Sequence, residues 1–570
     1  MDKSLLRVEH LSVDYKLNNG EVNAVRDVSF SLNRGDSLGI IGESGSGKTS
    51  LAMALMGLIK EPGKVRGNIY YENVDINSLS KREIKSIRWN KIALVFQNSL
   101  DVLNPLLTID EQISEVIVKH LNLSKESTSK RVKELLEMVG LSAEIKGYYP
   151  HQLSGGMRQR VLIAMALACD PEVLIVDEPT TALDAVYKNE IIKLLSELHK
   201  EKKFALLVIS HELETIFHLT SKINVMYSGC ILEKGITSEV LKNPMHTYTR
   251  GLVDSSPTIN PYRDLWGIPG ESGGSKESGC PFRKRCTQSI EICSTRVPKL
   301  EYVSLERQVA CHRGGIVTLL EGKNINKIYK NKKTIVKACD DCSIKVRSGE
   351  IVALIGESGS GKTTLAGVLS GTILPQEGEV VFEGKLVSGN NFTSRKNGIQ
   401  IVFQDPFSSI NERFSIEEAI SEPLRIIKED SYEEIKIEVK KALEEVQLPN
   451  DENFLNRKCY TLSGGQRQRV SIARSLVMKP KLLIADEITS MLDPSTKANI
   501  IRLLKGLQNK NGFSMLYITH DLPIARKIAD RVYVMHNGKI VEQGIASKIF
   551  SDPTDDYTKK LVKEGMSEFN

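Results

Sequence analysis

The chain has 570 residues with 41% apolar and 26% charged side chains, which is the composition of a globular protein. Its 77 basic and 71 acidic residues leave a net charge of only +6, so nucleic acid is not expected as an electrostatic partner. The sequence has neither a run of roughly 20 apolar residues nor an apolar signal segment, so we expect a cytoplasmic protein that reaches membranes only through partners.

An internal repeat organises the sequence. The octamer GESGSGKT occurs at residues 42–49 and again at 356–363. Three later elements recur at a constant spacing of 309 residues, which indicates a duplication without insertions in this part. These elements are LSGG at Leu153 and Leu462, an apolar run before Glu178 and Glu487, and a second run before His211 and His520. We therefore predict domains at 1–254 and 316–570, joined by a linker at 255–315 with a small ordered nucleus of its own.

Each copy has the pattern of an α/β domain. Short apolar runs that end at a glycine, an acid or a histidine are typical of buried parallel strands with functional groups at their carboxyl ends. Charged, leucine-rich stretches at 127–141 and 432–446 predict a helical subdomain in each copy. The apolar runs are SLGIIG, VLIVD and LLVIS in the first copy and IVALIG, LLIAD and MLYIT in the second.

The repeated octamer matches the phosphate-binding pattern G-x-x-x-x-G-K-[ST] between a strand and a helix. Its glycines allow backbone amides to close on phosphates, the lysine should contact the β- and γ-phosphates, and the threonine should bind Mg²⁺. A simple glycine-rich turn would not recur in this context twice. The residues that we expect at ATP are Gly42, Ser44, Gly45, Ser46, Gly47, Lys48, Thr49 and Ser50 in the first copy, and Gly356, Ser358, Gly359, Ser360, Gly361, Lys362, Thr363 and Thr364 in the second.

The sequence LSGGMRQR, repeated as LSGGQRQR, resembles the signature of ABC transporter nucleotide-binding domains, and the resemblance covers nearly the whole chain. It implies two tandem P-loop NTPase domains, each with a helical subdomain, that pair head to tail within one chain around two ATP molecules. The resemblance further implies that Ser463, Gly464 and Gly465 close the first ATP site, while Ser154, Gly155 and Gly156 close the second. Each serine precedes a helix whose amides could clamp a γ-phosphate.

The same resemblance assigns roles to the remaining repeated residues. Glu178 and Glu487 would be general bases. His211 and His520 would contact the γ-phosphate, and Asp177 and Asp486 would support Mg²⁺. Gln97 and Gln404 would contact Mg²⁺ and sense a membrane partner, while Tyr15 and Tyr329 would stack on adenine. Two departures from the family pattern are Ile488 in place of proline, and Asn98–Ser99 in place of Asp–Pro.

The linker resembles the C-terminal extension of oligopeptide, dipeptide and nickel importer ATPases, through GCPFRKRC, EIC and ACHR. The resemblance implies a 4Fe–4S cluster on four cysteines, although four thiolates also suit zinc and the thiols could carry no metal. The other five cysteines fall inside cassette sequence and are expected to pack. The four cysteines of the linker are Cys280, Cys286, Cys293 and Cys311.

The resemblance implies an ATPase that energises a membrane importer for peptides, nickel or metal chelates. Two permease subunits and an extracytoplasmic substrate-binding protein would be its partners, and it would lie on the cytoplasmic face of the membrane. The alternative is a twin-cassette ABC protein that acts on ribosomes in translation. Those proteins join their cassettes by a long charged helix or carry N-terminal cysteine clusters, which this sequence does not match. The solute cannot be inferred from this chain.

Overall fold

The computed structural model describes residues 4–17, 20–96, 102–181, 183–257, 264–265, 267–270, 278–330, 335–405, 410–427, 431–490 and 492–566. The chain forms two compact units. The first comprises the chain up to residue 259 with 270–285 and 289–315, and the second comprises 260–269, 286–288 and 316–570. The domain boundaries at 254 and 315 stay predictions.

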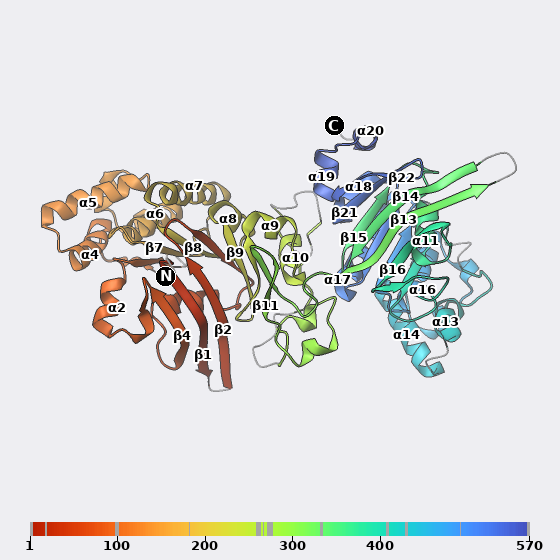
Figure 1. Cartoon of the computed structure of the whole chain (residues 1–570), viewed down its shortest axis with the longest axis horizontal. Coiled ribbons are helices and arrows are strands. Elements are labelled where there is room, and N and C mark those ends of the chain that lie inside the picture. The colour runs from red at the N-terminus through yellow and green to blue at the C-terminus, as the bar shows by residue number, and fades with distance from the viewer. Residues whose placement is uncertain are drawn as a thin grey trace. The chain divides into compact units, whose positions relative to one another are not determined.

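Two sheets form the first unit, a small antiparallel one and a larger mixed one (Figure 1). The small sheet has the order β2 (Gly20–Leu32), β1 (Leu6–Leu17), β4 (Gly63–Tyr71), β5 (Val74–Asp75). The large sheet has the order β11 (Leu300–Ser304), β12 (Arg307–Ala310), β10 (Cys230–Ile236), β9 (Lys222–Tyr227), β3 (Ser37–Ile41), β8 (Ala205–Ser210), β7 (Val173–Asp177), β6 (Ile92–Val95).

The strands predicted from apolar runs form the parallel centre of the large sheet. β3 pairs with β8 and β9, and β7 pairs with β6 and β8, all in parallel. Every residue of β3, β7 and β8 is buried, which explains why these runs have no polar alternation. Their carboxyl ends carry the repeated functional residues, so the sheet gathers these residues at one edge.

Helices surround the first large sheet or form a separate helical part. In that part α4 and α5 lie side by side (Figure 1), begin at the N-caps Thr108 and Ser124, and bury apolar side chains such as Val132, Leu135 and Leu136. The α-helices of the first unit are α1 (Lys48–Leu55), α2 (Lys81–Ile87), α4 (Ile109–Leu121), α5 (Lys125–Met138), α6 (Gly155–Ala166), α7 (Ala185–Lys202), α8 (Leu213–Leu219), α9 (Thr237–Lys242) and α10 (Thr247–Asp254).

The second unit repeats the same two sheets. Its small sheet has the order β14 (Ile335–Arg347), β13 (Thr318–Lys330), β16 (Glu377–Phe382), β17 (Lys385–Leu386). Its large sheet has the order β18 (Ile399–Val402), β19 (Leu482–Asp486), β20 (Ser514–Thr519), β15 (Ile351–Ile355), β21 (Arg531–His536), β22 (Lys539–Ile545). This order matches β6-β7-β8-β3-β9-β10 of the first unit, as a duplication requires.

The helices of the second unit also follow the first. α13, α14 and α16 share one buried apolar cluster with the face of the large sheet, so the helical part is packed onto the strands that carry the repeated residues. The α-helices are α11 (Lys362–Ser370), α13 (Ile416–Ile427), α14 (Tyr432–Glu445), α15 (Glu452–Leu455), α16 (Gly464–Leu476), α17 (Pro494–Asn511), α18 (Leu522–Ile528), α19 (Ala546–Ser551) and α20 (Asp556–Met566).

Part of the predicted linker is built into the first large sheet. β12 pairs antiparallel with β10 and with β11, and it thereby adds two strands that the second sheet does not contain in the described residues. Arg307 on β12 forms an ion pair with the fully buried Glu233 of β10 and donates to the carbonyl of Asn243. Residues 300–310 therefore fold as part of the first unit's sheet.

None of the helices in the described ranges combines the length and the apolar character that a membrane crossing needs.

Candidate functional site

The two phosphate loops have the same closed geometry. Between β3 and α1, Nζ of the buried Lys48 donates to the carbonyls of Gly42 (2.7 Å) and Glu43 (3.0 Å). In the second unit Nζ of Lys362 donates to the carbonyls of Gly356 (3.0 Å) and Glu357 (2.8 Å). In each copy the ammonium group therefore bridges two carbonyls of the loop that is predicted to bind the phosphates.

One glycine of each loop is required by sterics. Gly47 has φ 102° and precedes α1, and a Cβ there would lie 1.9 Å from the carbonyl oxygen of Ala24. Gly361 has φ 108°, and a Cβ would lie 2.0 Å from the carbonyl oxygen of Ala338. The loop thus passes too close to the antiparallel strands β2 and β14 for any side chain.

The threonine and the aspartate that are predicted at Mg²⁺ lie together in each copy and fit a divalent cation. The hydroxyl of Thr49 lies near Asp177 and that of Thr363 near Asp486, so that each hydroxyl lowers the pKa of its neighbouring carboxyl. Burial outweighs this effect and raises the pKa of Asp177 to about 6, and it raises the pKa of Asp486 as well. Within the described residues, Oδ1 of each aspartate is buried without a hydrogen-bond partner. A buried carboxylate oxygen beside a hydroxyl is the donor set that Mg²⁺ prefers.

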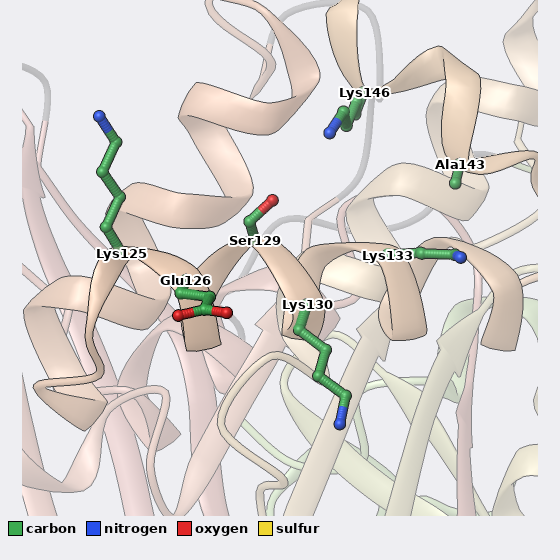
Figure 2. A pocket seen from close by; sticks show the side chains of 7 residues that line it. All are labelled: Lys125, Glu126, Ser129, Lys130, Lys133, Ala143 and Lys146. Carbon is green, nitrogen blue, oxygen red and sulfur yellow. The ribbon is translucent and has the colours of Figure 1, made fainter.

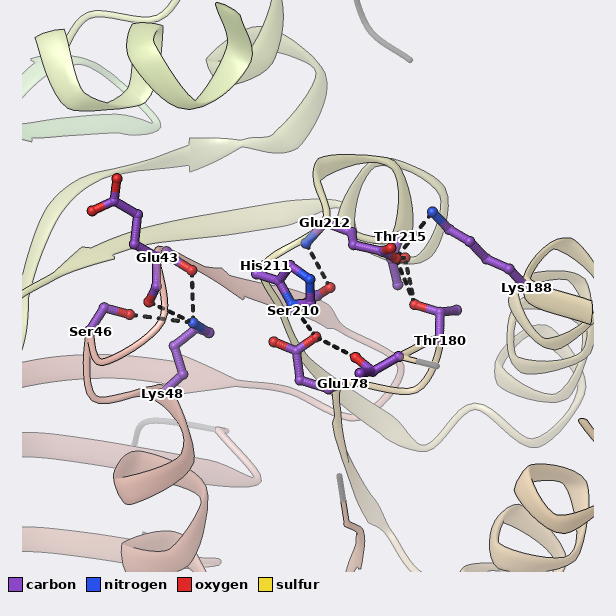
Figure 3. A network of polar contacts seen from close by, with 12 residues as sticks. Glu43, Ser46, Lys48, Glu178, Thr180, Lys188, Ser210, His211, Glu212 and Thr215 are labelled. Atoms are coloured by element: carbon purple, nitrogen blue, oxygen red, sulfur yellow. Dashed lines mark hydrogen bonds and ion pairs between the residues drawn. The ribbon is translucent and has the colours of Figure 1, made fainter. Parts of the chain in front are cut away.

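In the first unit the predicted base is held by the predicted switch histidine. Nδ1 of His211 lies 2.7 Å from Oε2 of Glu178 (Figure 3). Thr181 donates to the same oxygen at 3.2 Å. Glu178 directly follows β7 and has φ 53°, a left-handed conformation that costs free energy in a residue other than glycine. His211 directly follows β8, which runs beside β7, so both side chains lie at the same edge of the sheet.

In the second unit the predicted base has different neighbours. Glu487 also has positive φ, at 45°, but Nδ1 of His520 is 3.6 Å from its carboxylate. Nε2 of Gln404 donates to Oε2 of Glu487 at 3.1 Å, and Nζ of Lys362 lies 3.6 Å from Oε1. Gln97, the first-copy counterpart of Gln404, lies outside the described residues, as do Asn98 and Ser99.

The signature serines cap long helices. Oγ of Ser154 accepts from the amide of Met157 at 3.3 Å, and Oγ of Ser463 accepts from Gln466 at 3.3 Å. Ser154, Gly155 and Ser463 are exposed, so these helix starts can meet an external ligand. Each signature belongs to one unit and its predicted ATP to the other, so the roles of Ser154–Gly156 and Ser463–Gly465 stay predictions.

The two predicted adenine-stacking tyrosines differ in exposure. Tyr15 on β1 is partly buried against the core of the first unit, and its hydroxyl donates to Ser50 at 3.4 Å. Tyr329 on β13 is 44% exposed, with Nζ of Lys327 5.6 Å from its ring centre. Of the two, Tyr329 has the more accessible ring face, and both roles stay predictions.

A family model described as "ABC transporter" matches residues 25–181 and 339–490, which include both phosphate loops and both strands that end in the predicted bases. This chain belongs to the ABC transporter family. The prediction of two tandem α/β domains of the ABC type is confirmed, and the chain is an ABC-type ATPase. A second model, the "Oligopeptide/dipeptide transporter, C-terminal region", matches residues 232–293.

Curated ABC relatives match almost the whole chain. The "Glutathione import ATP-binding protein GsiA" of Escherichia coli O157:H7 is 36% identical over 98% of this chain and 89% of that protein. Its counterpart in Escherichia coli K12 is 35% identical over the same shares. Among solved structures, the dimeric ATP-binding cassette MJ0796 bound to ADP and phosphate is 30% identical, with a TM-score of 0.36, over 40% of this chain and 99% of that chain.

The ABC cassettes contain a polar network that the sequence analysis missed. Oε2 of Glu212, the residue after His211, accepts from the hydroxyls of Thr180 (2.8 Å) and Thr215 (3.0 Å) and pairs with Lys188 (3.1 Å) (Figure 3). It therefore connects the loop after the predicted base to helix α7. The corresponding Asp521 pairs with Lys497 in the second cassette. An acidic residue directly follows each repeated histidine, and this repeated acid could have predicted the network from the sequence.

Ile488 replaces the usual proline without leaving a gap. Its side chain is 1% exposed and lies in the apolar cluster of the second cassette's helical part. The substitution thus adds apolar packing directly beside Glu487.

The described cysteines do not form a metal site. Cys280 and Cys293 are buried, and the amide of Cys280 donates to the carbonyl of Cys293 at 2.8 Å. Cys311 has its sulfur 3.9 Å from the carbonyl oxygen of Gly315, and Cys286 is partly buried. Across the described ranges, no three histidine, cysteine or acidic side chains converge on a common point. The described residues therefore give no support to the predicted 4Fe–4S or zinc site.

A basic pocket lies outside the ATP residues. It has a volume of about 710 Å³ and is formed by α5 and the short helix at Ala143–Gly147 (Figure 2). None of the predicted ATP residues lines it. Its lining residues are Lys125, Glu126, Ser129, Lys130, Lys133, Ala143 and Lys146.

Proposed function

We propose that this chain is the ATP-hydrolysing subunit of a membrane importer for peptides or peptide-like solutes such as glutathione, with nickel or metal chelates as the other candidate cargo. The match of residues 232–293 to the oligopeptide/dipeptide transporter C-terminal region carries the proposal, because it is specific to one branch of the ABC family. The relatives named as glutathione import proteins support the same branch. No comparison supports the translation alternative.

Each ATP site would combine groups from both cassettes. Lys48 and Lys362 would contact the β- and γ-phosphates, and the pairs Thr49–Asp177 and Thr363–Asp486 would hold Mg²⁺. Bound Mg²⁺ would neutralise charge that develops on the phosphate oxygens. Glu178 and Glu487 would accept the proton of the attacking water, with His211 and His520 orienting them. The signature serines Ser154 and Ser463 would close the opposite sites when the two cassettes pair.

Transport would require partners that this chain does not provide. Two permease subunits would dock beside Gln97 and Gln404, and a substrate-binding protein would deliver the solute from outside. The chain would then lie on the cytoplasmic face of the membrane. The contact between Gln404 and Glu487 supports the docking assignment, because it connects the predicted docking position to the predicted base.

Reconstitution tests the proposal. We expect the chain, placed in vesicles with candidate permeases and binding protein, to accumulate glutathione or short peptides when ATP is supplied. The double variant Glu178→Gln/Glu487→Gln should assemble but transport nothing, because both bases are gone. Co-sedimentation with ribosomes, together with failure to bind any permease, would overturn the importer assignment.

The cysteine centre is a separate question. A 4Fe–4S cluster or zinc at Cys280, Cys286, Cys293 and Cys311 stays a prediction from resemblance alone. Anaerobic purification followed by iron, sulfide and zinc assays decides it. Stoichiometric metal in the parent protein that is lost in Cys280→Ser would support the metal centre. Metal-free parent protein would contradict it.

A further inference from the structure

The extension after the first cassette contacts the phosphate loop directly. Arg285, in the short helix Arg283–Arg285, donates from both terminal nitrogens to the two carboxylate oxygens of Glu43, at 2.7 and 3.0 Å. The Arg285 side chain is 6% exposed and that of Glu43 is 27% exposed. A two-pronged arginine–carboxylate contact that is largely shielded from water is strong and directional.

Aromatic rings fix Arg285 in place. Phe282 packs edge-on against Tyr227 and tilts against Tyr248, with ring centres 5.2 and 5.4 Å apart. The guanidinium lies 5.7 Å from the ring centre of Tyr227 and 5.9 Å from that of Phe282. Burial alone would lower the pKa of Arg285, but its hydrogen bonds to Glu43 and Tyr227 raise it, so the side chain stays charged.

Glu43 is also held through its backbone. Its amide donates to the hydroxyl of Tyr248 at 2.9 Å, and its carbonyl accepts from Nζ of Lys48 at 3.0 Å. The same residue therefore touches the extension with its carboxylate and the phosphate-binding lysine with its carbonyl.

The second cassette has only half of this arrangement. The amide of Glu357 donates to the hydroxyl of Tyr557 at 3.3 Å, and Tyr557 stacks on His536, which occupies the position of Tyr227. No cation in the described part of the chain pairs with the carboxylate of Glu357, which is exposed. The arginine contact is therefore specific to the cassette that carries the extension.

We propose that Arg285 is a positioning residue of the first ATP site, which holds the carboxylate of Glu43 on the extension side and away from Lys48 and the incoming triphosphate. This inference rests on the proposed role of Lys48 in binding ATP. A carboxylate released from Arg285 can compete with the phosphates for the ammonium and repel them, since both effects act over a few ångströms in a poorly hydrated loop. The extension thereby sets the nucleotide affinity of one cassette and not of the other.

Site-specific nucleotide titration tests the proposal. The full chain with Lys362→Ala reports the first site alone, with trinitrophenyl-ATP and Mg²⁺ as the probe. In that background we expect Arg285→Gln to weaken binding roughly 5- to 50-fold. Arg285→Lys should lose less, because it keeps a charge but only one contact point. In the converse Lys48→Ala background, Arg285→Gln should leave the second site unchanged.

A second substitution separates charge from simple structural support. Adding Glu43→Gln to Arg285→Gln should restore the lost affinity, because no free carboxylate remains. If the double variant binds as weakly as Arg285→Gln, or if Arg285→Gln has no effect, the proposal is overturned. If binding persists when Lys48 and Lys362 are both changed to alanine, the ATP-site assignment fails and the proposal fails with it.

Discussion

Nδ1 of His211 lies 2.7 Å from the carboxylate of Glu178, whereas Nδ1 of His520 is 3.6 Å from that of Glu487. Two sites with the same repeated residues thus hold their predicted bases differently. In the second site Gln404 and Lys362, the lysine of the phosphate loop, contact the carboxylate of Glu487. Because the phosphates are predicted to bind the same ammonium, we expect nucleotide binding at this site to weaken the contact between Glu487 and Lys362.

The predicted bases can be tested by isosteric substitution. Glu178→Gln and Glu487→Gln should each impair hydrolysis to a similar degree, since both copies keep all the predicted groups. The double variant should lose on the order of 10²–10⁴ in steady-state rate while it still binds ATP, because only proton transfer is removed. Phosphate release and nucleotide binding are the two measurements. Full activity of Glu487→Gln would mean that the second site does not turn over.

Alanine substitutions at two glycines of the first phosphate loop test the steric argument, with one as the control for the other. Gly47→Ala should abolish nucleotide binding at the first site, because its Cβ would lie 1.9 Å from a backbone oxygen of Ala24. Gly45→Ala should largely keep binding at a cost of about 1–2 kcal/mol in stability, because Gly45 has φ 78° but no atom within 4 Å of the added carbon. Nucleotide titration in the Lys362→Ala background measures both. Equal losses for the two variants would contradict the steric argument.

The extension should contribute to stability through one buried ion pair. Arg307→Ala leaves Glu233, which is 0% exposed, without its cation and should lower the free energy of unfolding by about 3–5 kcal/mol. Lys193→Ala removes one partner of the exposed pair Lys193–Glu197 and should change it by less than about 1 kcal/mol. Urea unfolding, followed through the first transition, gives both values. A small effect of Arg307→Ala would mean that β12 is not stably paired.

Stability should also depend on pH through His246. Burial lowers its pKa from about 6.5 to about 4, so the folded chain binds fewer protons here than the unfolded chain between these two values. Neutral His246 therefore contributes on the order of 3 kcal/mol to the free energy of unfolding. This stabilisation is fully present above pH 6.5 and is lost as the pH falls to about 4. Nearby, the amide of His246 donates to Glu233, which is paired with Arg307.

A matched variant isolates this group. His246 caps α10, with Nδ1 accepting from the amide of Tyr248 at 3.1 Å. Asparagine can accept the same hydrogen bond but does not titrate in this range. Urea midpoints of the parent should fall more steeply than those of His246→Asn between pH 6.5 and 4. Parallel curves would show that His246 is not the group responsible.

Most of the fold, and the candidate ATP site, could be predicted because both depend on local sequence patterns that repeat. The strands before Glu178 and His211 are short buried runs, and Lys48 stands at a fixed distance from its glycines. The contact between Arg285 and Glu43 could not be predicted, because it joins residues 242 positions apart and one of them lies outside the repeat. The strands at 300–304 and 307–310 were missed because five and four residues give little periodicity.

The pairing of β12 with β10 has a consequence for how the protein can be shortened. A chain cut after residue 254 would lose β11 and β12 and expose the backbone amides and carbonyls of β10 along an otherwise finished sheet. Such a bare edge attracts strands from other molecules and promotes aggregation. A first half meant for separate expression should therefore extend at least through Ala310, so that β12 continues to shield that edge.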